Sequence, residues 1–207
     1  MSVPDPVNKP DIENLIERAK SGDPEALGEL LLCYRQYMLF LARSQANDNL
    51  QAKLDASDIA QEVCMHAHQG IAQFRGTTST EFAGWLRGVL GHVVAMQLRK
   101  YFGTQKRDAR LEQSIDQRLA SASGFLNSGL AANITSPSQN FARKEVFLKM
   151  ASAMESLPPD YRQVIMYRHL DALPFAEIAK RMKRSVDSVE KLWVRGLTKL
   201  RQLMGDE

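Results

Sequence analysis

The chain has 207 residues, 44% of them hydrophobic and 25% charged, with a net charge of +3 at pH 7. These values fit one large or two small globular domains, and the mild net charge means that any nucleic-acid-binding surface has to be local. No apolar run is long enough to span a bilayer, and the polar N-terminus with Pro4, Pro6 and Pro10 is unlike a signal peptide. We therefore expect a cytoplasmic protein without a membrane segment.

The cysteines and two neighbouring histidines carry no recognisable chemistry. Cys33 and Cys64 lie on helix-like segments at no metal-binding spacing, which favours reduced, buried thiols. His66 and His68 are two positions apart and do not share a helix face. Without a constellation of catalytic or metal-ligating residues, the sequence predicts no enzyme, no metal site and no cofactor.

Residues 11–107 carry the patterns of four helices. Asp11 caps the first, and Asp23-Pro24 caps and begins a second that runs to about Ala46. The third and fourth are expected over about 57–74 and 80–102. The second helix has an apolar face formed by Leu27, Leu30, Leu31, Tyr34, Met38 and Leu41. Strand-like alternation is scarce along the chain, so we predict an all-α fold.

The composition changes over residues 108–136. This stretch is rich in Ser, Ala, Asn and Gln, contains Gly124 and Gly129, and has weak hydrophobic periodicity. We interpret it as a flexible linker. A further helix opens at Ser136-Pro137 and leads into the last helices, so the expected organisation is two small helical domains, 11–107 and 137–204, joined by this linker.

The C-terminal residues have the pattern of a helix-turn-helix. An apolar face over 175–182 is followed by the polar break Lys183-Arg184-Ser185 and a second amphipathic helix. Ser185 is suited to cap that helix, whereas Lys183 stands where a glycine is common, so a left-handed conformation there would cost about 1 kcal/mol. The predicted buried stripe of the second helix consists of Val186, Val189, Leu192, Trp193 and Leu197.

Basic residues recur on the outer face of this last helix. They include Lys191, Arg195, Lys199 and Arg201. Such a face suits phosphate contacts, although a charge run alone is more often a solvated helix surface. Combined with the helix-turn-helix spacing, it favours DNA binding through the major groove.

Three segments, in this order, resemble bacterial RNA polymerase sigma factors of the extracytoplasmic-function (ECF) subfamily of the sigma-70-like family. They are Asp58-Ile59-Ala60-Gln61-Glu62; Phe74-Arg75-Gly76 followed by Phe82, Trp85 and Leu86; and Leu157-Pro158-Pro159-Asp160-Tyr161-Arg162 leading into Phe175–Ala179 and Trp193–Leu197. The resemblance implies a subunit that binds core RNA polymerase and directs transcription initiation at particular promoters. Because many members of the family are held by an anti-sigma factor, such a protein is a further candidate partner.

The resemblance also implies roles for individual residues. Polymerase binding falls to Asp58, Gln61 and Glu62, which share one polar helix face. Recognition and melting of the minus-ten element fall to Phe74, Arg75, Trp85, His92, Arg99, Lys100, Lys106 and Arg107. Recognition of the minus-thirty-five element falls to Ser185, Asp187, Ser188, Glu190, Lys191, Arg195 and Lys199.

The sequence departs from the family pattern at several of these places. His92 stands where an Asn is usual, Gly88 and Gly91 replace larger residues, and Glu190 stands where a basic residue is frequent. These changes bear on how many of the family's DNA contacts remain. For Phe74 a place in the core is an equal alternative to a place in a base-binding pocket.

Two other functions compete with the sigma-factor interpretation. A stand-alone helix-turn-helix repressor or activator would bind DNA tightly by itself, usually as a symmetric dimer. A helical protein-interaction adaptor would use its basic helix only as a solvated face. The segments 58–62 and 74–86 argue against the repressor or activator, which would not need them. Co-purification with core RNA polymerase would distinguish a sigma factor from the adaptor.

Overall fold

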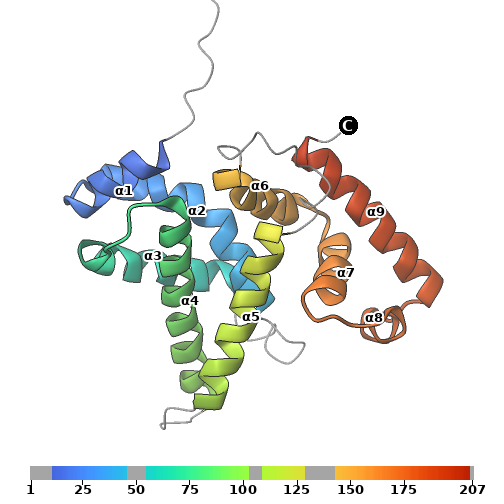
Figure 1. Ribbon diagram of the computed structural model, residues 1–207. Helices are drawn as coiled ribbons and strands as arrows, with labels where there is room; N and C mark the ends of the chain where they lie inside the picture. Colours follow the sequence, from blue (N-terminus) through green and yellow to red (C-terminus); the bar gives the residue numbers. More distant parts are fainter. Residues whose placement is uncertain (1–10, 46–54, 103–108, 129–142, 206–207) are drawn as a thin grey trace, which may run out of the picture.

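The computed structural model describes residues 11–45, 55–102, 109–128 and 143–205, and every element within these ranges is helical (Figure 1). The elements are α1 (Ile12–Lys20), α2 (Pro24–Ser44), α3 (Ala56–Gly70), the short 3₁₀ helix η1 (Ile71–Gln73), α4 (Ser79–Phe102), α5 (Ala109–Ser128), α6 (Arg143–Ser156), α7 (Pro159–His169), α8 (Phe175–Met182) and α9 (Val186–Met204). The all-α prediction is confirmed.

Aspartates begin the first three helices. Asp11 and Asp23 each accept backbone N–H groups of the first turn, as their sequence positions predict, and Pro24 occupies the first helical position. Asp55 caps α3 by accepting the backbone N–H of Ser57 at 2.6 Å. The predicted starts of α1 and α2 are therefore confirmed, and α3 begins slightly earlier than expected.

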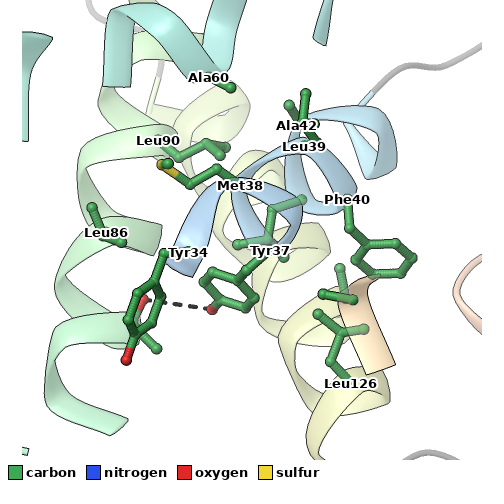
Figure 2. Packing of buried hydrophobic residues seen from close by; sticks show 14 of the residues in the cluster. Tyr34, Tyr37, Met38, Leu39, Phe40, Ala42, Ala60, Leu86, Leu90 and Leu126 are labelled. Atoms are coloured by element: carbon green, nitrogen blue, oxygen red, sulfur yellow. Dashed lines mark hydrogen bonds between the residues drawn. The ribbon is translucent and has the colours of Figure 1, made fainter. Parts of the chain in front are cut away.

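The central element is α2, which packs against α1, α3, α4, α5 and α6. Six consecutive residues, Tyr37–Ala42, are buried, so this part of the helix is enclosed on all sides (Figure 2). The single apolar face predicted for α2 is therefore incomplete, because a face that points at α5 and α6 is buried as well. An unbroken apolar run on a helix is the signature of such enclosure.

The prediction of a flexible linker over 108–136 is wrong for residues 109–128. These residues form α5, whose Ile115, Leu119, Ala122 and Leu126 are buried against α4, α2 and α6. Leu126 lies beside the α2 residues in Figure 2. The four apolar residues are spaced by four, three and four positions, which is one face of a helix. Residues 129–136, and the predicted helix start at Ser136, lie outside the described residues.

α6 connects the N-terminal helices with the C-terminal helices. The Phe147 ring lies against the rings of Tyr34 and Tyr37, with centroids 6.0 and 5.4 Å apart. At the other end of the helix, Glu155 is paired with Arg43 of α2 at 2.9 Å. The helix that leads into the C-terminal helix-turn-helix is thus anchored in the N-terminal core.

Arg162, four residues after Pro158, binds the end of the preceding helix. Its guanidinium donates hydrogen bonds to the backbone carbonyls of Met154, Glu155 and Leu157, at 3.0, 2.9 and 3.1 Å. These carbonyls lie at the C-terminal end of α6, where the helix itself offers no donors. The side chain therefore closes one helix end while belonging to the next helix.

Candidate nucleic-acid interface

The C-terminal helix-turn-helix is present as predicted. α8 and α9 are joined by a tight turn in which Lys183 has φ 53° and ψ 45°, the left-handed conformation expected from its position. Ile178 and Ala179 of α8 and Val189 of α9 are buried between the helices. The Ser185 hydroxyl caps α9 by accepting the N–H of Ser188 at 3.2 Å.

Most of the residues predicted to read the minus-thirty-five element lie on the outer side of α9. Ser185, Asp187, Glu190, Lys191, Arg195 and Lys199 are exposed, and Ser188 is half-buried. Lys191 is paired with Asp187 at 2.7 Å, one turn away. Among the described residues, Glu190, Arg195 and Lys199 have no hydrogen-bond or ion-pair partner, so these three side chains are free to meet a ligand.

The apolar stripe predicted for α9 is correct except at its first residue. Val189 is buried and Leu192, Trp193 and Leu197 are half-buried, but Val186 is 43% exposed. Val186 is the first residue of the helix and therefore projects beyond the contact with α8. Trp193 is held at the interface, because its indole N–H donates to Nε2 of His169 at 3.3 Å and its ring meets Phe175.

The loop between η1 and α4 is held from both sides. The Glu81 carboxylate accepts the backbone N–H groups of Thr77 and Thr78, while the Thr78 hydroxyl accepts the N–H of Glu81. This reciprocal arrangement is a capping box, and the backbone donor of Thr77 is the main cause of the lowered pKa of Glu81. Lys20 of α1 donates to the Gly76 carbonyl at 2.9 Å. The loop is therefore a rigid projection.

Phe74 belongs to the core and not to the surface of this loop. It is 8% exposed and packs against Phe82 and Trp85, with ring centroids 5.6 and 5.2 Å apart. A Cβ atom at Gly76 would overlap the Phe74 ring, which explains the glycine. The prediction that Phe74 contacts DNA directly does not fit this burial. Trp85 is half-buried in the same cluster, whereas Arg75 is exposed.

The far half of α4 carries the remaining candidates for the minus-ten element. His92 and Lys100 are exposed. Arg99 is half-buried and paired with Glu112 of α5 at 2.9 Å, a contact that the sequence interpretation missed because it treated α5 as a linker. Lys106 and Arg107 lie outside the described residues.

The predicted polymerase-binding face is on α3. Asp58 and Gln61 are exposed, but Glu62 is half-buried and accepts a hydrogen bond from the Gln97 side chain of α4. Gln61 borders a groove of about 400 Å³ between α2 and α3, whose wall includes Leu32 and Arg35. Leu32 is 71% exposed, the largest exposed fraction of any large apolar residue in the described part of the chain. The apolar face predicted for α2 leaves Leu32 out, so helical periodicity placed it off the core, but no sequence signal marked it as part of a site.

Other kinds of site find no support in the described residues. No three His, Cys, Asp or Glu side chains come together in a way that would hold a metal ion. His66 lies next to His92, with ring centroids 5.9 Å apart, but the two are not joined by a third ligand. Within the same residues, every helix is too short or too polar to cross a membrane.

Comparison with known proteins places these surfaces in a family. Residues 30–101 match the model of Sigma-70 region 2, and residues 147–200 match that of Sigma-70 region 4, together more than half of the chain. The chain belongs to the sigma-70 family. Region 2 of this sigma factor contains α3, the rigid loop and nearly all of α4, while region 4 contains the helix-turn-helix. α5 lies between the two matches.

Similar curated proteins include ECF sigma factors and a sigma-H factor. The sigma factor is 27% identical over 175 residues to the ECF RNA polymerase sigma-E factor of Escherichia coli K12, covering 84% of both chains. It is 26% identical over 182 residues to the RNA polymerase sigma-H factor of Pseudomonas aeruginosa, covering 86% of this chain and 85% of the other. These matches support the ECF subfamily. A solved chain of the flagellar Sigma-28/FlgM complex is 17% identical over 96% of this chain and 100% of that chain, with a low TM-score of 0.32.

Proposed function

We propose that this ECF sigma factor engages its partners through three separate surfaces. As a sigma factor, it binds core RNA polymerase and promoter DNA and directs promoter-specific initiation of transcription. The observation that carries this function is the presence of both sigma regions in one chain, with a helix-turn-helix whose last helix exposes the unpaired side chains of Arg195 and Lys199. The protein has no catalytic activity of its own and works in the cytoplasm, where the polymerase is.

The first surface is the polar face of α3, which docks on the polymerase. Asp58 and Gln61 are exposed there, and Leu32 and Arg35 extend the same surface across the groove to α2. An exposed leucine with polar neighbours is the composition of an interface centre and its rim. Glu62 supports this surface from behind, since its carboxylate is bound by Gln97.

The second surface recognises the minus-ten element. Arg75 on the rigid loop and His92 and Lys100 on α4 are exposed. Their role is to receive a base extruded from the duplex and to hold the adjoining backbone. Extruding a base costs a few kcal/mol, and a loop that is already ordered adds no further ordering cost on binding.

The third surface is the outer side of α9, which enters the major groove at the minus-thirty-five element. Glu190 lies near the N-terminal end of α9 and is suited to accept a hydrogen bond from a cytosine amino group. Arg195 and Lys199 lie further along, where the helix leaves the groove, and are suited to phosphate oxygens.

Transcription in vitro tests the function directly. Purified protein is added to core RNA polymerase on a library of promoter sequences, and transcript start sites are mapped. We expect a discrete set of start sites that share two upstream elements, and none with the core enzyme alone. Absence of such transcripts, together with tight DNA binding by the free protein as a dimer, would instead identify a stand-alone repressor or activator.

A further inference from the structure

α5 lies against the half of α4 that carries the candidate minus-ten contacts. Its buried residues Ile115, Leu119, Ala122 and Leu126 hold it in the N-terminal core. The helix falls between the Sigma-70 region 2 and region 4 matches, so neither region accounts for it. The role of α5 therefore has to be inferred from the contacts that it makes in this chain.

The two helices approach each other closely at Gly91. A Cβ atom there would lie 3.3 Å from both Asp116 Oδ1 and Leu119 Cδ1, whereas one at Gly88, a turn earlier, would meet nothing within 4 Å. A glycine inside a helix costs about 1 kcal/mol relative to alanine. At Gly91 the close packing of α5 compensates this cost.

The side of α5 that faces α4 at this contact is acidic. Glu112 pairs with Arg99 at 2.9 Å, and Asp116 lies one turn further along α5. A cavity of about 350 Å³ at this junction is lined by Gly91, His92, Ala95, Arg99, Glu112 and Asp116. The Glu112 carboxylate thus occupies a position beside Arg99 that suits a DNA phosphate, since both are anionic acceptors for a guanidinium.

We propose that α5 is an autoinhibitory helix, in which Glu112 and Asp116 cover the basic half of α4 until promoter DNA displaces them. The inference rests on the proposed role of α4 in minus-ten recognition. In the docked arrangement Arg99 is not available to DNA, so the apparent affinity for the promoter is reduced by the fraction of molecules with α5 released. Release exposes the four buried apolar side chains of α5, so the docked form predominates in the free protein.

The first test neutralises the acidic side without changing its shape. Glu112→Gln combined with Asp116→Asn in the full chain is assembled with core polymerase, and promoter affinity is measured at fixed salt. We expect binding about three to five times tighter than wild type, because a partly exposed ion pair contributes up to about fivefold to the docked state. The matched control is Glu17→Gln with Glu25→Gln, which removes two exposed carboxylates on α1 and α2.

The second test follows α5 itself by hydrogen exchange. In the free protein, Gly91→Gln should raise the exchange of residues 112–127, and Gly88→Gln should leave it unchanged, since only the first side chain meets α5. In the wild-type holoenzyme, the same residues should lose protection when promoter DNA is added. The proposal is overturned if α5 stays protected in the promoter complex, if Gly91→Gln leaves its exchange unchanged, or if the neutralised variant binds no more tightly than the control.

Lys100→Ala separates this proposal from the function on which it rests. Lys100 is exposed at the end of α4 and outside the contact with α5. If Lys100→Ala leaves promoter affinity unchanged, the DNA-binding role of α4 has failed. If it weakens binding while α5 stays docked on promoter DNA, that role holds and the autoinhibition alone is refuted.

Discussion

Replacing Arg162 by methionine should destabilise the protein by about 2–3 kcal/mol. The guanidinium donates to three backbone carbonyls at the end of α6, and methionine keeps much of the aliphatic packing but offers no donor. Each lost hydrogen bond costs about 1 kcal/mol when its acceptor remains partly buried. Burial lowers the pKa of Arg162, because the charged guanidinium loses hydration in the folded protein. This lost hydration offsets part of the gain from the three hydrogen bonds, so the net loss of stability lies at or below their sum.

Thermal and urea denaturation measure this change. For a chain of this size, the melting temperature should fall by about 5–10 °C. Arg162→Lys should give an intermediate loss, because an ammonium keeps the charge but cannot reach three carbonyls in a fixed fork. Arg201→Met, on the exposed surface of α9, is the matched control and should change stability by no more than about 0.5 kcal/mol. If Arg162→Met melts with this control, the capping argument is wrong.

Four further predictions concern single sites. Gln61→Ala should weaken polymerase binding about fivefold in a pull-down while the melting curve is unchanged; a lower melting temperature would mean that the side chain is structural. Arg195→Ala should weaken promoter binding and reduce the salt slope of the affinity by about one unit, and an unchanged slope would exclude a phosphate contact. Lys183→Gly should stabilise the protein by about 0.5 kcal/mol in urea, because the left-handed strain removed exceeds the entropy that glycine adds to the unfolded chain. Burial lowers the pKa of His169, so the stability that the neutral imidazole contributes is complete above about pH 6.5 and is lost as the pH falls through the lower folded pKa. The Trp193 fluorescence should report this pH-dependent loss of stability, and His169→Asn should abolish the pH dependence.

Local chemistry determined much of this protein from the sequence alone. Helix caps at Asp11 and Asp23, the turn at Lys183 and the polar break before α9 depend on neighbouring residues, and the structure has each of them where the sequence predicts. The sigma-factor resemblance likewise rested on short motifs with fixed spacing, and the matches to regions 2 and 4 confirm it. Such features are readable because each is decided within a few residues of backbone.

The tertiary structure alone decided which helices bury which side chains. α5 is rich in small and polar residues, and we therefore predicted a linker although its four apolar residues have helical spacing. It is a helix because α2, α4 and α6 bury those four side chains. The same packing brought Glu112 to Arg99, and it decided for Phe74 between the two places that the sequence left open, the core and a base-binding pocket. Most helical stability comes from burying an apolar face against partners distant in the chain, and a local pattern does not name those partners.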